Sequence, residues 1–179
     1  MKHASAYASL EPTVSVANLA AAITTAASMA IREKEHVCDR IYAQQPNLLA
    51  SVLVQRLPGV SMPTIDVVLN ILIVLYLAIE ESGQVLAIVS EADQERELRR
   101  FTATIRFSVG LRGDALAQSF EQTTAYREKF LFAYVVDTLR RAGLTDLPNE
   151  TSKYPILVAI NLVNCIATAR RTTPLGSKV

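Results

Sequence analysis

The most apolar stretch of the chain covers residues 65–79 and reads IDVVLNILIVLYLAI, with Asp66 and Asn70 as its only strongly polar members. A helix that is apolar on every side has to be covered on every side, either by protein or by lipid. The pattern therefore predicts a central helix over about residues 64–82, with the rest of the chain packed around it.

The same run is short for a membrane span. Fifteen helical residues rise about 22 Å, whereas the hydrocarbon core of a bilayer is about 30 Å thick. The nearest basic residues are Arg56 and Arg96, too far away to act as the positive flanks that orient a spanning helix. The run is interpreted as a core helix. A bundle that opens and inserts this helix into a membrane is an alternative that no residue requires.

A long helix is expected from Val14 to Gln45. Apolar and small residues recur on one stripe of it, and the small ones would let another helix approach closely. The heptad positions are Val16, Ile23, Ala30 and Val37, with Ala20, Ala27 and Ile41 beside them. Pro46 ends the helix, because the residue before a proline is pushed out of the α region.

Helical patterns account for most of the remaining chain. The expected helices cover residues 47–57, 85–109, 126–141 and 154–171. Residues 85–89 are the one place where a short strand competes with a helix. These patterns predict an all-α, single-domain bundle of five to six helices over residues 14–171, with an irregular segment at 1–13 and a tail at 172–179.

Composition narrows the functional classes. The chain has 179 residues, 50% of them hydrophobic, a mean hydropathy of +0.24 and a net charge of +1. This charge gives no general attraction to nucleic acid or anionic membrane, although local clusters of charge still matter. Cys38 and Cys165 are too few for a secreted disulfide scaffold, and Glu11-Pro12 interrupts any signal peptide. We expect a soluble, cytoplasmic protein with free thiols, and its Ala- and Arg-rich composition is typical of a bacterial source.

One pair of residues has the spacing of a metal site. Glu33 and His36 lie three positions apart, as in the Glu-x-x-His motif of di-iron bundles, so a helix would place them on one face. That site needs a second such motif, and the only other histidine is His3. A solvated charged turn is the preferred interpretation, and a helical metalloenzyme is the weaker alternative.

A basic helix face is the second candidate. Arg96, Arg99 and Arg100 share one side of a predicted helix and would suit phosphate groups or an acidic partner. Glutamates interleave with them, and the Glu95–Arg99 spacing favours an ion pair within the helix. A solvated helix face is therefore preferred to a nucleic-acid site.

Three asparagines lie within apolar helices: Asn70, Asn161 and Asn164. A buried amide without a partner costs about 1–3 kcal/mol, so each is expected to find one. Such residues can also fix helix register or oligomeric state. Equally, each asparagine could simply form its hydrogen bonds with other residues of the same bundle.

No catalytic motif accompanies these features. The sequence predicts a non-enzymatic helical protein that acts by protein–protein contact as an adaptor or regulator, most simply as a homodimer, with no cofactor. A nucleic-acid-associated regulator is the first alternative and a metalloenzyme the second.

Overall fold

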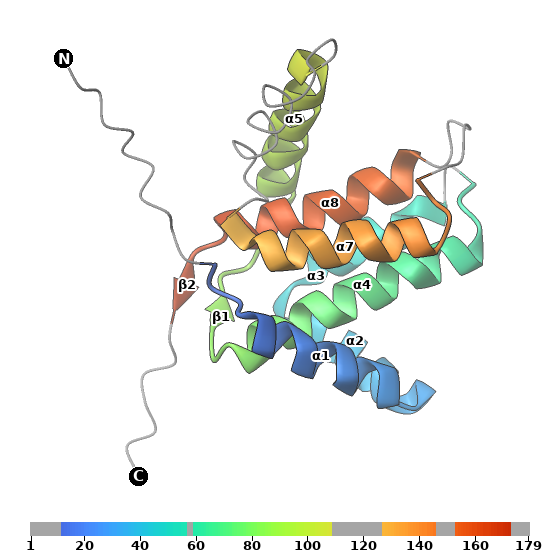
Figure 1. Ribbon diagram of the computed structural model, residues 1–179, viewed down its shortest axis with the longest axis vertical. Coiled ribbons are helices and arrows are strands. Elements are labelled where there is room, and N and C mark those ends of the chain that lie inside the picture. The colour runs from blue at the N-terminus through green and yellow to red at the C-terminus, as the bar shows by residue number, and fades with distance from the viewer. Residues whose placement is uncertain (1–11, 57–58, 109–126, 146–152, 173–179) are drawn as a thin grey trace, which may run out of the picture.

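The computed structural model describes residues 12–56, 59–108, 127–145 and 153–172, and over these residues the protein is an all-α helical bundle, as predicted (Figure 1). Seven α-helices are described. They are α1 (Val16–Ser28), α2 (Ile31–Gln44), α3 (Pro46–Leu53), α4 (Met62–Glu81), α5 (Glu91–Ser108), α7 (Lys129–Arg141) and α8 (Lys153–Thr168). A 3-10 turn, η1 (Val54–Arg56), and two short strands, β1 (Val85–Leu86) and β2 (Arg171–Thr172), complete the described elements.

Helix α4 is the centre of the bundle. Every residue from 71 to 79 is buried, and Ile71 and Leu75 are fully so. Helices α1, α2, α3, α7 and α8 all pack against α4. Among the described helices, α4 alone is long and apolar enough to cross a membrane. In this structure its apolar surface is covered by the neighbouring helices, which confirms the predicted core helix.

The ends of α4 follow from local sequence. The Ser61 hydroxyl accepts a hydrogen bond from the Thr64 amide at 3.4 Å, and Pro63 lies in the first turn. At the other end, Gly83 adopts a φ of +68° and its amide donates to the Glu80 carbonyl at 2.9 Å.

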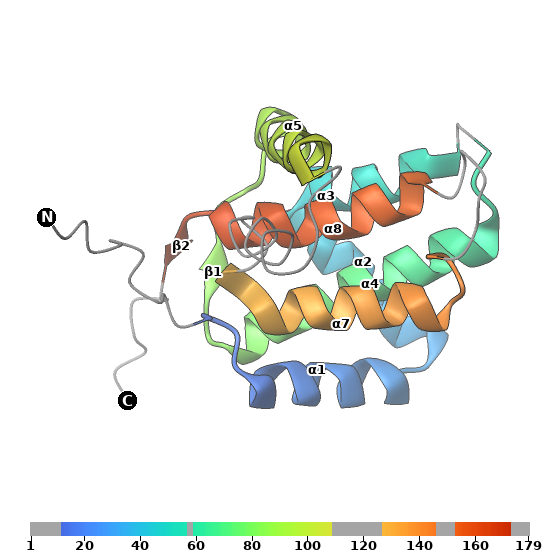
Figure 2. The ribbon, with the colours of Figure 1, turned by 45° about the horizontal axis from the view of Figure 1, so that its top comes forward.

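The prediction of one long helix over residues 14–45 is wrong, because the helix is interrupted at Met29 and Ala30. Both residues are extended, with ψ of 132° and 163°. Glu33 stabilises the new start, since its carboxylate accepts a hydrogen bond from the Ala30 amide at 2.6 Å. A straight helix over 14–45 would reach about 48 Å, well beyond the roughly 30 Å of α4. Breaking the helix lets both halves pack beside the core (Figure 2).

The segment after α4 is not helical at once. β1 pairs antiparallel with β2, with Val85 opposite Thr172, and residues 87–90 have no regular secondary structure. The predicted helix over 85–109 therefore begins late, at Glu91, and the alternative of a short strand near residue 85 is confirmed. The last helix ends at Thr168 rather than Arg171.

Helix α5 lies at the edge of the bundle. It packs mainly on α8 (Figures 1 and 2). Its described core contribution is confined to Phe101 and Glu97, both of which are buried. Most of the irregular segment and tail predicted at the two ends of the chain lies outside the described residues.

Candidate functional site

The two candidate metal ligands do not converge on a site. Glu33 is occupied at the start of α2, where it binds the Ala30 amide. His36 is exposed, and its Nδ1 lies 3.9 Å from an Asp39 carboxylate oxygen. Within the described ranges, no three histidine, cysteine, aspartate or glutamate side chains gather into a possible metal site.

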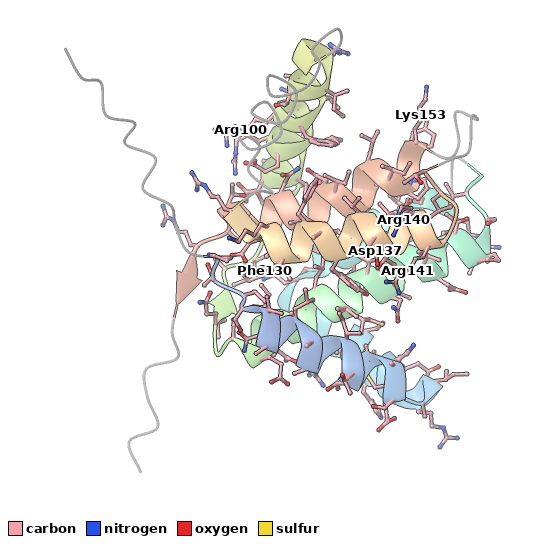
Figure 3. The ribbon with its side chains drawn as sticks, viewed as in Figure 1. Arg100, Phe130, Asp137, Arg140, Arg141 and Lys153 are labelled. Carbon is pink, nitrogen blue, oxygen red and sulfur yellow. The ribbon has the colours of Figure 1, made fainter. Side chains whose placement is uncertain are left out.

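The three candidate arginines are all paired with acids of their own helix. Arg100 lies on α5, at a distance from the arginines of α7 (Figure 3). The ion pairs are Arg96–Asp93 at 2.7 Å, Arg96–Glu97 at 3.1 Å, Arg99–Glu95 at 2.5 Å and Arg100–Glu97 at 3.3 Å. Each arginine is thus neutralised by a nearby acid of α5, as is typical of a solvated charged helix face.

The three asparagines have different surroundings. Asn70 is half-buried rather than buried, and its side-chain oxygen accepts a hydrogen bond from Lys34 Nζ at 3.3 Å. Asn161 and Asn164 are buried on α8. Asn161 donates to the Gln94 carbonyl of α5 at 3.0 Å, whereas both polar atoms of the Asn164 amide lack a hydrogen-bond partner among the described residues. Asn161 therefore forms a polar contact between α8 and α5.

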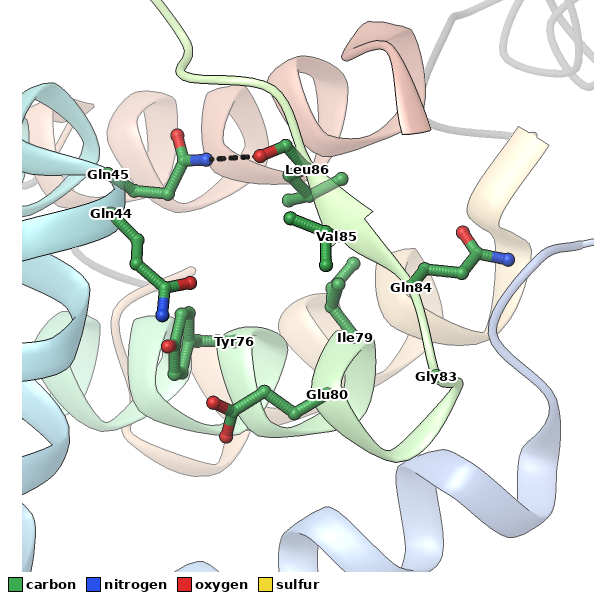
Figure 4. A pocket seen from close by; sticks show the side chains of 9 residues that line it. All are labelled: Gln44, Gln45, Tyr76, Ile79, Glu80, Gly83, Gln84, Val85 and Leu86. Atoms are coloured by element: carbon green, nitrogen blue, oxygen red, sulfur yellow. Dashed lines mark hydrogen bonds between the residues drawn. The ribbon is translucent and has the colours of Figure 1, made fainter. Parts of the chain in front are cut away.

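A small pocket of about 250 Å³ opens between the ends of α2 and α4 and strand β1 (Figure 4). Its walls combine Tyr76, Ile79 and Glu80 of α4 with β1, with Gln44 at the end of α2 and with Gln45 between α2 and α3. Arg40 stacks over the Tyr76 ring, 5.8 Å from its centre, and donates to Glu80 at 2.8 Å. Burial raises the pKa of the Tyr76 hydroxyl, so the phenol stays protonated. The one carboxylate here is held by an arginine, so the pocket has no evident nucleophile or general base.

Gln45 closes one side of this pocket and is a residue that the sequence marked only as a helix end. It is buried, and its side-chain amide donates to the carbonyls of Leu86 and Ala87 at 3.2 and 3.1 Å. Its side-chain oxygen accepts from the Val89 amide at 2.9 Å. Gln45 therefore holds the extended segment after α4 in place.

One face of α1 exposes small and apolar side chains. This helix buries Leu19, Ala22 and Ala26 against the core. A second stripe, 60° wide or less on a helical projection, is exposed and consists of Val16, Ala20, Ile23 and Ala27. None of the 13 residues of α1 is charged. We call these four side chains the α1 stripe.

The α1 stripe corrects the predicted heptad pattern in an informative way. Its residues were expected to take part in helix packing, and Val37 and Ile41 of the same pattern are indeed buried. Val16 and Ile23 are instead 57% and 38% exposed. Part of the packing surface that the sequence indicated is therefore left partly exposed by the described part of the chain.

Comparison with family models, with curated proteins and with solved structures finds no match to this chain.

Proposed function

We propose that this protein acts by protein–protein contact rather than by catalysis, and that its first partner is a second copy docked through the α1 stripe. The observation that supports this is a surface helix with no charged residue. Helices at a protein surface normally present charged and polar residues to water, so an uncharged, partly apolar outer face is suited to burial against another helix.

The geometry of the stripe suits pairing of two α1 helices. Ala20 and Ala27 alternate with the larger Val16 and Ile23, which lets two helix backbones approach closely around a twofold axis. A helix of 13 residues is about 20 Å long. One such pair buries less than the about 800 Å² per partner of a standard stable interface. We therefore expect a weak dimer that dissociates on dilution.

Sedimentation equilibrium over a range of protein concentrations tests this proposal. Wild-type protein should shift from monomer towards dimer as its concentration rises. Ile23→Lys places a charge in the centre of the stripe and should leave the protein monomeric. Ile88→Lys is the matched control, because Ile88 is an equally apolar residue, 63% exposed, outside α1.

Two results would overturn the proposal. A wild-type protein that remains monomeric at every concentration has no self-association to explain. Equal loss of dimer in Ile23→Lys and Ile88→Lys would show that the α1 stripe is not the specific interface. Circular dichroism of each variant verifies that the bundle is folded before the comparison is made.

The alternative functions have less support from the geometry. The arginines of α5 are paired with acids, so a nucleic-acid-associated role has no exposed unpaired phosphate contact at Arg96, Arg99 or Arg100. A metalloenzyme through Glu33 and His36 has one of its two ligands engaged at a helix start. A cytoplasmic location and a role as adaptor or regulator remain part of the proposal.

A further inference from the structure

The pocket between α2, α4 and β1 has a polar side and an apolar side. The polar side is formed by Gln44, Tyr76 and Glu80, and the apolar side by Ile79, Val85 and Leu86 (Figure 4). An apolar cavity of about 150 Å³ holds a benzene molecule. A pocket of about 250 Å³ therefore has room for a somewhat larger molecule with one polar and one apolar part.

An arginine and a glutamate lie together at the polar side. Glu80 follows Tyr76 by one turn of α4, and Arg40 precedes Gln44 by one turn of α2, so each pair shares one face of its helix. Arg40 donates to the Glu80 carboxylate at 2.8 Å, and the two side chains are 45% and 40% exposed. A molecule in the pocket thus meets one anion in the wall and one cation bound to it.

Tyr76 lies beneath this ion pair. Its ring carries the Arg40 guanidinium at 5.8 Å from the ring centre, and the residue is only 7% exposed. Its hydroxyl is buried and makes no hydrogen bond of normal geometry with a described residue, although Arg40 and Glu80 lie beside it. This protonated hydroxyl is a donor for a carboxylate that binds Arg40.

The helix ends at the pocket favour a positive group near Glu80. Helix α2 ends at Gln44 and helix α4 ends at Glu81, and both ends border the pocket. The carbonyl groups at the end of a helix carry partial negative charge, which attracts a cation. An ammonium group beside Glu80 is therefore favoured by the carboxylate and by the helix ends together.

We propose that this pocket binds a zwitterionic α-amino acid with an aliphatic side chain of about the size of leucine. The ligand carboxylate replaces Glu80 as the partner of Arg40, and the ligand ammonium group replaces Arg40 as the partner of Glu80. The aliphatic side chain contacts the apolar side of the pocket. A ligand with a single charge takes one member of the ion pair and leaves the other without a partner, whereas a zwitterion gives a partner to both.

The binding should be weak, because the ion pair between Arg40 and Glu80 has to open before the ligand can bind. A small ligand that forms two charged contacts and buries one aliphatic side chain is expected to have a Kd of about 1 mM. Glycine lacks the aliphatic part and should bind about tenfold more weakly or less.

NMR titration of the full chain with L-leucine tests the proposal. Isocaproate, which is leucine without its amino group, and isopentylamine, which is leucine without its carboxylate, are the matched probes. Leucine should shift the amide signals of Gln44, Gln45 and Val85 with a Kd of about 1 mM. Each singly charged probe should bind about tenfold more weakly, because one charged contact is missing.

Variants of the ion pair show which end of the ligand each residue binds. Arg40→Gln should weaken leucine binding about tenfold, to the level of isopentylamine, because the carboxylate loses its cation. Glu80→Gln should weaken it about tenfold, to the level of isocaproate. Arg99→Gln and Glu95→Gln alter an exposed ion pair on α5 and are the matched controls, which should bind leucine as the wild type does. Circular dichroism of each variant verifies that the bundle is folded.

Three outcomes would overturn the proposal. Leucine that causes no shift at any concentration excludes an amino-acid site. Isocaproate or isopentylamine that binds as tightly as leucine would assign the pocket to a simpler ion. Equal effects of the Arg40 and Arg99 variants would place the binding elsewhere. Leucine binding by the Ile23→Lys variant, which alters the α1 stripe, separates this site from self-association, so that either proposal can fail alone.

Discussion

The side chain of Gln45 forms hydrogen bonds with a backbone segment much as a neighbouring strand would. Its amide forms three hydrogen bonds with the backbone of residues 86–89 and is almost fully buried. Gln45→Ala should lower the free energy of unfolding by about 2–3 kcal/mol, because buried backbone groups lose their partners. Gln44→Ala, the exposed neighbour, should change it by less than about 0.5 kcal/mol. Urea denaturation followed by circular dichroism measures both, and equal effects would contradict the assigned role.

Asn164 is the opposite case, because no described residue forms a hydrogen bond with either polar atom of its buried amide. Asn164→Leu keeps a similar volume and removes the desolvated amide, so it should stabilise the protein by about 1 kcal/mol. Asn161→Leu should gain less or lose stability, since it also removes the bond to the Gln94 carbonyl. Thermal unfolding compares the two variants. If Asn164→Leu instead destabilised the protein, the Asn164 amide would have a hydrogen-bond partner in solution.

At the scale of the element, the start of α5 is set by a reciprocal cap. The Asp93 carboxylate accepts hydrogen bonds from the Ser90 amide at 3.0 Å and the Ser90 hydroxyl at 2.7 Å. The Ser90 hydroxyl in turn accepts from the Asp93 amide at 3.1 Å. These hydrogen bonds, with a contribution from Arg96, lower the pKa of Asp93 to about 2. The cap is thus coupled to the ionisation of one side chain.

This coupling predicts a pH dependence with a definite sign. An unperturbed aspartate has a pKa of about 3.9, so the cap stabilises the folded state above that pH. The contribution is lost as the pH falls towards 2, the folded-state pKa. Ser90→Ala should raise the pKa of Asp93 and leave the low pKa of Asp137, which Arg140 causes, unchanged. NMR titration of the carboxyl carbons measures both, and an unchanged Asp93 would contradict the cap.

The sequence predicted those elements whose signals are local. The apolar run over residues 65–79 is such a signal, and the central helix that it predicts is confirmed as α4. The break at Ala30 was missed, because no glycine or proline marks it and the length of α4 decides it. The role of Gln45 was missed for a related reason: its partners lie more than 40 residues away.

The candidate site was predictable only in part. The residues of the α1 stripe were identified from their heptad spacing, but the spacing does not say which side of the helix the core will cover. In the structure, α1 packs on α4 and buries the face that carries Leu19, Ala22 and Ala26, which leaves the α1 stripe outside that contact. For the arginines of α5, the interleaved glutamates correctly indicated local ion pairs.

At the scale of the whole molecule, the helices do not contribute equally. Most of the described helices contact α4, which makes α4 the element on which the cooperativity of the bundle depends. Glu128, at the start of α7, adds a link over 114 residues, since its carboxylate accepts from the Val14 amide at 3.2 Å. Helix α5 stands outside this arrangement, because it packs mainly on α8 through a partly polar contact.

This difference predicts two kinds of response in hydrogen exchange. Leu75→Ala, at a fully buried position of α4, should destabilise the whole bundle by about 3–4 kcal/mol. The slowly exchanging amides of α1, α4, α7 and α8 should then lose protection together. Phe101→Ala, at the buried side of α5, should lower protection in α5 far more than in α4, because α5 can open as a separate unit. Hydrogen exchange measured by mass spectrometry resolves the helices, and a uniform loss in Phe101→Ala would show that α5 unfolds only with the bundle.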